Sequence, residues 1–347
     1  MIRFLIASPH SGAGKTVITL AIMRLLRKRA VKYQPAKSGP DYIDPKFHEV
    51  ASGENSVNLD AWAMKKEEIE TLAGSGNLIV EGAMGLFDGA GVSGVGSSAD
   101  LAKILSLPVV LVIDSAKTAH SIAALVQGFK SFDNHVTVAG VILNRVASDR
   151  HLNILSAALS KIDVPLLGFM FKSNIFSLSE RHLGLVQASE NQNLEHWIDT
   201  VAEALAPSLD LETLTELTSQ PKLKAQENKK PPGQRIAVAR DVAFEFSYPH
   251  HLRSWRLAGA SISFFSPVAD EAVAKDADFI FLPGGYPELH AGQIAAAQRF
   301  KSSIKGHAAN DTPIYGECGG YMTLGDAIID KHGVSHEMLG LLNLETS

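Results

Sequence analysis

The sequence predicts a two-domain α/β protein in which each domain is built on a mostly parallel β-sheet. Its 347 residues leave room for about two compact domains. Short β-branched apolar runs alternate with longer amphipathic stretches, the pattern of buried parallel strands joined by helices. A segment rich in proline and lysine interrupts this alternation, which then resumes. We therefore expect one α/β domain on each side of that segment.

Composition narrows the class of protein further. Lys and Arg number 32 against 37 Asp and Glu, a formal charge of −5, and 46% of the residues are hydrophobic. These values exclude a wholly disordered chain and argue against a nucleic-acid partner. The longest apolar run, Leu107 to Ile113, contains a proline and falls far short of the ~20 residues that span a bilayer. With a single cysteine, Cys318, and no signal peptide, we expect a cytoplasmic protein without a membrane partner.

The expected elements of the first domain, residues 1–205, begin with a strand that runs straight into a glycine-rich loop. The apolar spacing after Thr16 predicts a helix that ends at the basic cluster Arg27 to Arg29. The expected strands are 4–7, 78–80, 109–113, 138–143 and 165–169.

Residues 206–234 are interpreted as a linker, because prolines and lysines replace apolar residues there. A basic phosphate-binding patch is the alternative. The second domain, residues 235–347, has expected strands at 236–239, 261–265, 279–282 and 314–315.

The loop after the first strand is Ser11-Gly12-Ala13-Gly14-Lys15-Thr16. Its context between strand and helix favours a nucleotide phosphate site, where backbone N–H groups and the helix N-terminus face the phosphates. Lys15 would reach the β- and γ-phosphates, and the Thr16 hydroxyl would ligate Mg²⁺. Pro9 replaces the first glycine of the common pattern, so a glycine-rich turn without a ligand is the alternative.

Carboxylates at strand ends are candidates for the remaining oxygen ligands of that Mg²⁺. Asp41 and Glu81 are both expected at strand ends, and Glu81, directly after the strand 78–80, should emerge at the carboxyl edge of the sheet. Asp44 and Asp88 lie close by in sequence. For the three aspartates a solvated loop position is the alternative. Asn144, after another strand, is a candidate contact for the nucleotide base, or else part of a plain turn.

The one cysteine stands in Gly316-Glu317-Cys318-Gly319-Gly320, between an expected strand and an expected helix. Small neighbours permit the sharp turn of a nucleophile elbow, and the helix N-terminus favours the thiolate. The N–H of Gly319 would supply one oxyanion donor, and Gly285, in a second glycine-rich turn, the other. A buried, inert cysteine is the alternative.

A cysteine nucleophile also needs a base, normally histidine. Downstream of Cys318 the sequence has two histidines, both in an expected loop, and upstream ones have ordinary surface positions as their alternative. None is identified as the base. The histidines considered are His332, His336, His250, His251, His290 and His307.

Six segments follow one another along the chain: Ser11 to Thr16, Gly39 to Pro45, Glu81 to Gly89, Glu180 to Leu185, Gly284 to Leu289 and Glu317 to Gly320. In this order they resemble the cobyrinic acid a,c-diamide synthase family, and the resemblance runs along the whole chain. It implies an ATP domain like that of dethiobiotin synthetase, a phosphate-loop NTPase fold, followed by a class I glutamine amidotransferase domain.

The implied reaction is ATP- and glutamine-dependent amidation of the a and c side-chain carboxylates of cobyrinic or hydrogenobyrinic acid, through an acyl phosphate, in cobalamin biosynthesis. The implied roles are nucleotide and Mg²⁺ binding for Lys15 and Thr16, metal binding for Asp41 and Glu81, substrate-side catalysis for Asp44 and Asp88, and glutaminase nucleophile for Cys318.

One departure stands out. The family's glutaminase histidine lies well beyond its cysteine, whereas only 29 residues follow Cys318 here. We therefore expect an incomplete second domain or a missing base, and amidation with ammonium rather than glutamine. A partitioning-type switch ATPase and an ammonia-dependent ligase with a non-catalytic second domain remain alternatives. The choice among cobyrinic acid, hydrogenobyrinic acid and a nickel sirohydrochlorin stays open, as does a homodimer.

Overall fold

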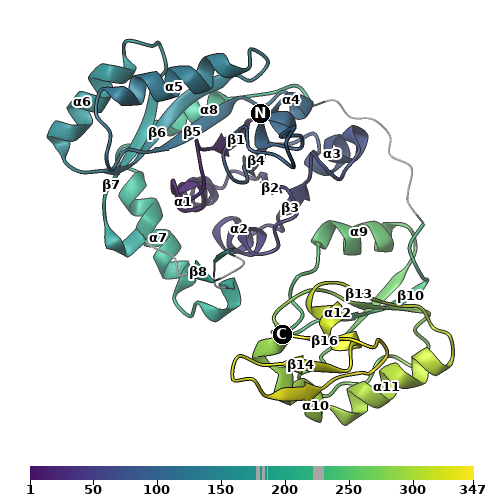
Figure 1. Ribbon diagram of the computed structural model, residues 1–347. Helices are drawn as coiled ribbons and strands as arrows, with labels where there is room; N and C mark the ends of the chain where they lie inside the picture. The colour runs from purple at the N-terminus through teal and green to yellow at the C-terminus, as the bar shows by residue number, and fades with distance from the viewer. Residues whose placement is uncertain (177–179, 182–183, 186, 222–229) are drawn as a thin grey trace. The chain divides into compact units, whose positions relative to one another are not determined.

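The computed structural model describes residues 1–176, 180–181, 184–185, 187–221 and 230–347. The chain forms two compact units, Met1–Gln226 and Glu227–Ser347, and each has its own sheet (Figure 1). In the described residues no helix combines the length and the apolar character needed to cross a membrane. The expected pair of α/β units with mostly parallel sheets is confirmed.

The first unit contains a seven-stranded sheet in the order β3-β2-β4-β1-β5-β6-β7, and every neighbouring pair is parallel. A separate short hairpin is formed by β8 (Glu180–Arg181) and β9 (Gly184–Leu185). The seven strands are β1 (Arg3–Ala7), β2 (Gln34–Ser38), β3 (Val57–Leu59), β4 (Leu78–Glu81), β5 (Val109–Asp114), β6 (Val138–Val146) and β7 (Leu166–Phe171).

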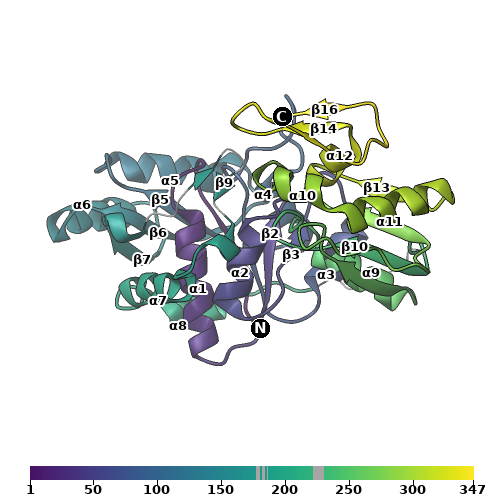
Figure 2. The ribbon, with the colours of Figure 1, turned by 90° about the horizontal axis from the view of Figure 1, so that it is seen from below.

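Helices cover both faces of this sheet. One core cluster packs α3, α4, α5 and α6 against one face, and α1, α2 and α7 contact one another on the other face (Figure 1, Figure 2). The helices are α1 (Lys15–Lys28), α2 (Asp44–Ser52), α3 (Lys66–Ala73), α4 (Ser98–Leu105), α5 (Ser121–Phe132), α6 (Asp149–Leu159), α7 (Leu194–Leu205) and α8 (Leu211–Glu216).

Burial of both faces explains why the strands are nearly all apolar. In β1, Leu5 and Ala7 belong to the cluster under α3 to α6, while Phe4 and Ile6 alternate with them and are also fully buried. The strand order makes β2, β4 and β1 neighbours. Because parallel strands end at one edge, the loops that follow these three strands meet there.

The first two strands in the sheet order, β3 and β2, were not among the strands expected from the sequence. The residues of β2 are Gln34-Pro35-Ala36-Lys37-Ser38, which lack the apolar run of a buried strand. Lys37 and Asn58, one on each strand, are nevertheless almost completely buried. Asn58 Nδ2 donates to the carbonyl oxygens of Gly39 and Asp41, and Lys37 bonds to carboxylates that are described below.

Part of the expected linker 206–234 packs on the first unit instead. It carries α8, whose Leu211 and Leu214 are buried, and continues to Ser219. The buried guanidinium of Arg3 donates to Ser219 Oγ at 3.1 Å and to two carbonyl oxygens of the loop after α3. The linker boundaries themselves stay a prediction.

The second unit contains a four-stranded parallel sheet in the order β11-β10-β12-β13 and a three-stranded sheet in the order β15-β14-β16. The strands are β10 (Arg235–Ala239), β11 (Ser261–Phe265), β12 (Phe279–Leu282), β13 (Ile314–Gly316), β14 (Ala327–Ile329), β15 (Ser335–Glu337) and β16 (Glu345–Thr346). The helices are α9 (Pro249–Leu257), α10 (Ala291–Ala296), α11 (Gln298–Ala309) and α12 (Gly319–Leu324).

Arg3 should be a major anchor of the first unit. We expect Arg3→Ala to lower the free energy of unfolding by about 3 kcal/mol, because it removes three hydrogen bonds from a buried charged donor. Ser219→Ala should cost about 1 kcal/mol. Urea unfolding followed by circular dichroism measures both, with the exposed Arg29→Ala as control, expected within about 0.5 kcal/mol. An Arg3→Ala effect no larger than that of the control would contradict this role.

Candidate functional site

The glycine-rich loop ends at Gly14, which caps α1 in a left-handed conformation with φ of 93°. A Cβ built on Gly14 would lie 2.1 Å from Asn144 Nδ2, so this position requires glycine for space as well as for conformation. The first turn of α1 follows at once and places Lys15 and Thr16 at its N-terminus. The loop therefore has the strand, turn and helix arrangement expected of a phosphate site.

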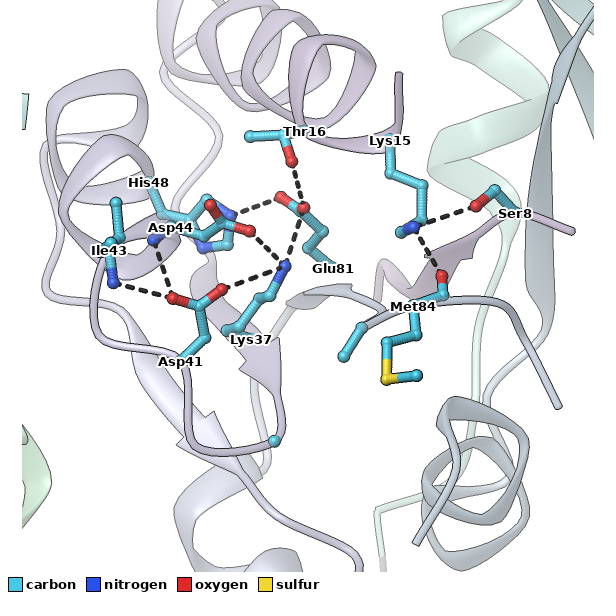
Figure 3. Close-up of polar contacts among 12 residues, drawn as sticks. Ser8, Lys15, Thr16, Lys37, Asp41, Ile43, Asp44, His48, Glu81 and Met84 are labelled. Carbon is cyan, nitrogen blue, oxygen red and sulfur yellow. Dashed lines mark hydrogen bonds and ion pairs between the residues drawn. The ribbon is translucent and has the colours of Figure 1, made fainter. Parts of the chain in front are cut away.

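Lys15 is folded inward rather than extended into solvent. Its Nζ donates to Ser8 Oγ at 3.0 Å and to the carbonyl oxygen of Met84 at 2.6 Å (Figure 3). Met84 presents that carbonyl from a left-handed conformation, with φ of 51°. Burial lowers the pKa of Lys15 to about 8, with nearby Glu81 opposing the shift. A phosphate would offer this ammonium a charged partner in place of two neutral oxygens.

Asn144, the expected contact for a nucleotide base, lies behind the loop. It is 5% exposed, and its Nδ2 donates to the carbonyl oxygen of Ala13 at 3.0 Å. Arg145 similarly donates to the carbonyl oxygen of Gly12. This geometry makes Asn144 a support of the loop, and its contact with a base stays a prediction.

Glu81, at the end of β4, is the centre of a buried polar cluster. Its Oε1 accepts from Thr16 Oγ1 at 2.7 Å and from Lys37 Nζ at 2.9 Å, and its Oε2 lies 2.8 Å from His48 Nε2 (Figure 3). The side chain of Glu81 is fully buried. Burial opposes its ionisation, but Lys37, His48 and Thr16 outweigh that effect and hold its pKa below the ordinary value. Glu81 is therefore an ionised carboxylate next to the phosphate loop.

Lys37 connects Glu81 to Asp44. Its ammonium forms ion pairs with both carboxylates and lies 3.8 Å from Asp41 Oδ2 (Figure 3). Burial alone would lower the pKa of Lys37, but these charges outweigh it and raise that pKa. Burial raises the pKa of Asp44, and the negative charges of Glu81 and Asp41 add to the shift against the effect of Lys37. One buried cation cannot fully compensate two buried carboxylates, so Glu81, with two further donors, is the better stabilised anion.

The two remaining predicted acidic residues close turns at the same edge. Asp41 Oδ1 accepts from the backbone N–H of Ile43 at 2.8 Å and of Asp44 at 3.3 Å, which fixes the start of α2. Asp88 is exposed, and its Oδ2 accepts from the N–H of Gly85 at 2.9 Å. The roles of Asp41 as a metal ligand and of Asp44 and Asp88 toward a substrate stay predictions.

The pair Thr16 and Glu81 fits a Mg²⁺ ion chemically, because a hydroxyl and an ionised carboxylate are hard oxygen donors held 2.7 Å apart. Within the described ranges, no group of three His, Cys, Asp or Glu side chains converges to hold a metal by itself. A Mg²⁺ ion in such a place takes its other ligands from phosphate oxygens and water.

Cys318 lies between β13 and α12 on a turn with the geometry of a nucleophile elbow. Its φ of 49° and ψ of −116° are strained for a residue with a side chain, and the thiol is exposed. A Cβ on Gly320 would lie 1.9 Å from the carbonyl oxygen of Leu282, so glycine is required for the backbone to pass. The exposed thiol rules out the alternative of a buried, inert cysteine.

The second glycine-rich turn is beside this cysteine, as expected for an oxyanion donor. A Cβ on Gly284 would lie 3.0 Å from Cys318 Cβ, and one on Gly319 would lie 3.0 Å from the carbonyl oxygen of Gly285. The turn thus packs directly on the elbow. The use of the Gly285 and Gly319 N–H groups as donors stays a prediction.

The histidines of the second unit have other partners. His336 lies in β15, with Nε2 2.9 Å from Asp330 Oδ2, while His332 is exposed in the preceding turn. The surface alternative given for His250 and His307 is wrong, because both are buried. His307 is on the inner face of α11, where Thr312 and a backbone carbonyl contact its two nitrogens. His251 and His290 are at the surface or partly exposed.

Sequence reasoning missed Lys37 and His48 as parts of the site. Lys37 was overlooked because β2 was not recognised as a strand. His48 has a signal in the sequence, since it follows Asp44 by four residues and α2 begins at Asp44. That spacing places both side chains on one face of the helix. The segment Glu180 to Leu185 falls partly outside the described residues.

Comparison with known proteins agrees with this division of the chain. Residues 4–186 match a family described as the CobQ/CobB/MinD/ParA nucleotide binding domain, and residues 235–347 match one described as the CobB/CobQ-like glutamine amidotransferase domain. Among solved structures, chloroplast FtsY from Physcomitrella patens aligns with a TM-score of 0.37 and 15% identity over 58% of this chain and 65% of that one. A similarity that weak carries no argument.

Curated relatives are far closer. The hydrogenobyrinate a,c-diamide synthase of Brucella anthropi is 52% identical over 99% of this chain and 81% of that protein. Proteins with the same name from a Sinorhizobium species and from Rhodobacter capsulatus are 48% and 47% identical, over 100% and 99% of this chain and 82% and 80% of theirs. The nucleotide-binding and glutamine amidotransferase domains both lie within the aligned length. The chain therefore belongs to the hydrogenobyrinate a,c-diamide synthase family.

Proposed function

We propose that this protein uses ATP and glutamine to convert the a and c side-chain carboxylates of hydrogenobyrinic acid to amides in cobalamin biosynthesis. The observation that best supports this proposal is the 2.7 Å hydrogen bond from Thr16 to Glu81, which joins the phosphate loop to an ionised carboxylate at the sheet edge. The amidotransferase domain adds an exposed cysteine on a strained turn. These features support a carbon–nitrogen ligase and argue against a switch ATPase.

The first half of the reaction activates a carboxylate. A carboxylate does not react with ammonia, because its carbonyl is electron-rich and oxide is a poor leaving group. One carboxylate oxygen attacks the γ-phosphorus of ATP, the bond to the β–γ bridging oxygen breaks, and ADP and an acyl phosphate form. Ammonia then attacks the acyl carbon, phosphate leaves, and the nitrogen loses a proton to give the amide.

Residues of the first unit would position and neutralise the reacting groups. Lys15 would exchange Ser8 and Met84 for the β- and γ-phosphates, since a charged partner is the stronger one. Thr16 and Glu81 would hold Mg²⁺, which neutralises phosphate charge when bound. Lys37, beside Asp44 at the same edge, would reduce repulsion between these carboxylates and an incoming anionic substrate. Asp44 and Asp88 stay the candidates for contact with that substrate.

The second half of the reaction releases ammonia. Cys318 Sγ would attack the amide carbon of glutamine, the C–N bond breaks, and the nitrogen takes up the proton given up by the thiol and leaves as ammonia. Water then hydrolyses the thioester to glutamate and the free thiol is restored. The tetrahedral intermediates carry an oxyanion, which the N–H groups of Gly319 and Gly285 are proposed to bind. Cys318 itself is the N-cap residue of α12, beside the turn that carries Gly284 and Gly285.

The printed names of the relatives favour hydrogenobyrinic acid over cobyrinic acid. The two differ in cobalt, whereas the reacting carboxylates are the same. A cytoplasmic location, a homodimer and the absence of a nucleic-acid partner are expectations from the sequence and stay so.

The two halves of the reaction should separate by substitution. We expect Lys15→Ala to lower the rate of amidation by about 100-fold or more with either ammonium or glutamine. The substitution removes the positive charge that would neutralise the phosphoryl group during its transfer. Amidation from glutamine is expected to be weaker than amidation from ammonium, because no base for the thiol is identified. Cys318→Ser should abolish the glutamine-dependent part and leave amidation from ammonium within about twofold of the unsubstituted protein. Mass spectrometry of hydrogenobyrinic acid after incubation with MgATP and each nitrogen source measures the product.

The same assay with cobyrinic acid serves as the control for substrate identity. No amide from hydrogenobyrinic acid with ammonium would contradict the proposed function, whereas equal loss from both nitrogen sources in Cys318→Ser would contradict only the role of the thiol.

The low pKa of Lys15 predicts a pH effect on ATP binding. In the free protein the pKa is about 8. A bound phosphate raises it, so between about pH 8 and 10 binding takes up a proton, and ATP affinity should fall by up to about tenfold per pH unit. Calorimetry in two buffers of different ionisation enthalpy counts the protons.

Lys15→Arg is the matched control, because its guanidinium stays charged throughout this range. It should bind ATP without proton uptake. Equal uptake in this variant would show that another group titrates, whereas no uptake in the unsubstituted protein would contradict the lowered pKa of Lys15.

A further inference from the structure

Three buried side chains and the partly buried Thr16 form one chain of hydrogen bonds from the edge strand of the sheet to the phosphate loop. Ser56 Oγ lies 3.1 Å from His48 Nδ1, and His48 Nε2 lies 2.8 Å from Glu81 Oε2. Glu81 Oε1 then accepts from Thr16 at 2.7 Å. Each residue comes from a different element or its flank: β3, α2, β4 and α1. Residues separated by as many as 65 positions are thus joined.

Both oxygens of Glu81 are occupied, but by different kinds of partner. Oε1 accepts from Lys37 and from Thr16, the residue at the start of α1 that is expected to bind Mg²⁺, whereas Oε2 faces His48. A carboxylate only accepts, so His48 Nε2 must carry the proton of this bond. His48, Ser56 and Glu81 are all 0% exposed. Without His48, water would not reach Oε2, and the carboxylate would have to turn or lose its charge.

We propose that His48, oriented by Ser56, is a positioning residue that turns Glu81 so that Oε1 faces the Mg²⁺ and phosphate end of the site. The inference rests on the proposed function only in assigning MgATP to the loop. His48 does not itself reach that ligand, because Glu81 lies between them. It acts by restricting the carboxylate to one orientation, as outer partners of metal-binding carboxylates do.

Lys37 does not make this role redundant. Lys37 shares its charge between Asp44 and Glu81 and contacts Oε1, the oxygen on the loop side. It therefore stabilises the negative charge of Glu81 and, with Thr16, holds only one of the two carboxylate oxygens. His48 contacts the opposite oxygen, and the two contacts together define the plane of the carboxylate.

The test measures Mg²⁺ binding rather than turnover. Binding of ATP is titrated by calorimetry at increasing Mg²⁺ and again in EDTA. We expect His48→Leu to raise the Mg²⁺ concentration for half-maximal ATP binding by about tenfold or more, with ATP binding in EDTA changed by less than about twofold. In His48→Gln the side-chain amide can still donate to Oε2, so its Mg²⁺ concentration for half-maximal ATP binding should be within about threefold of that of the unsubstituted protein.

Two hydroxyl variants separate positioning from folding. Ser56→Ala should raise the Mg²⁺ requirement by about threefold, because the ring of His48 loses its second contact. Ser52→Ala is the matched control: its hydroxyl is also buried and bonds to the backbone carbonyl of His48, but it has no connection to Glu81. It should lower thermal stability about as much as Ser56→Ala and leave the Mg²⁺ requirement unchanged. If His48→Leu fails to fold, the Mg²⁺ requirements of His48→Gln and Ser56→Ala test the positioning role instead.

The proposal would be overturned if His48→Leu changed ATP affinity equally with Mg²⁺ and in EDTA. It would also be overturned if the Mg²⁺ requirement were unchanged in folded His48→Leu and Ser56→Ala. If the unsubstituted protein bound ATP without any Mg²⁺ dependence, the nucleotide part of the proposed function would fail instead. Amidation of hydrogenobyrinic acid does not enter the measurement, so an error in the substrate leaves this test intact.

Discussion

The site depends on one buried ammonium, that of Lys37, placed between the carboxylates of Glu81 and Asp44. Two carboxylates so close together and so well buried would otherwise repel each other and become protonated. Lys37 keeps one of them charged, and the bonds from Thr16 and His48 select Glu81 as that one. The negative charge next to the phosphate loop is therefore a product of the fold and not of Glu81 alone.

The parallel sheet makes this arrangement possible. Because β1, β2 and β4 are neighbours, the loops and strand ends that carry Lys15, Lys37 and Glu81 converge without any long connection. The same logic applies in the second unit, where β12 and β13 are adjacent and bring the turn at Gly284 beside Cys318. The groups proposed for each half-reaction thus lie at the carboxyl ends of adjacent parallel strands.

The sequence was enough to predict both α/β units, the phosphate loop, Glu81 at the sheet edge and the cysteine elbow, because glycine spacing and apolar runs are local signals. It was not enough to find Lys37 or to locate Asn144 behind the loop. Lys37 lies in a strand without an apolar run and bonds to Glu81, 44 positions away on the neighbouring strand. The contact of Asn144 with Ala13 joins residues 131 positions apart. Such long-range bonds have no signature in a local window.

The most direct test of the proposed activation chemistry follows the oxygen between the β- and γ-phosphates of ATP. With hydrogenobyrinic acid and Mg²⁺ present and no nitrogen source, reversible acyl phosphate formation should scramble an ¹⁸O label from the bridging to the non-bridging β-positions, and Glu81→Gln should abolish this exchange while ATP hydrolysis is monitored separately. Exchange that persists in Glu81→Gln, or amide formation without any exchange in the unsubstituted protein, would contradict the account.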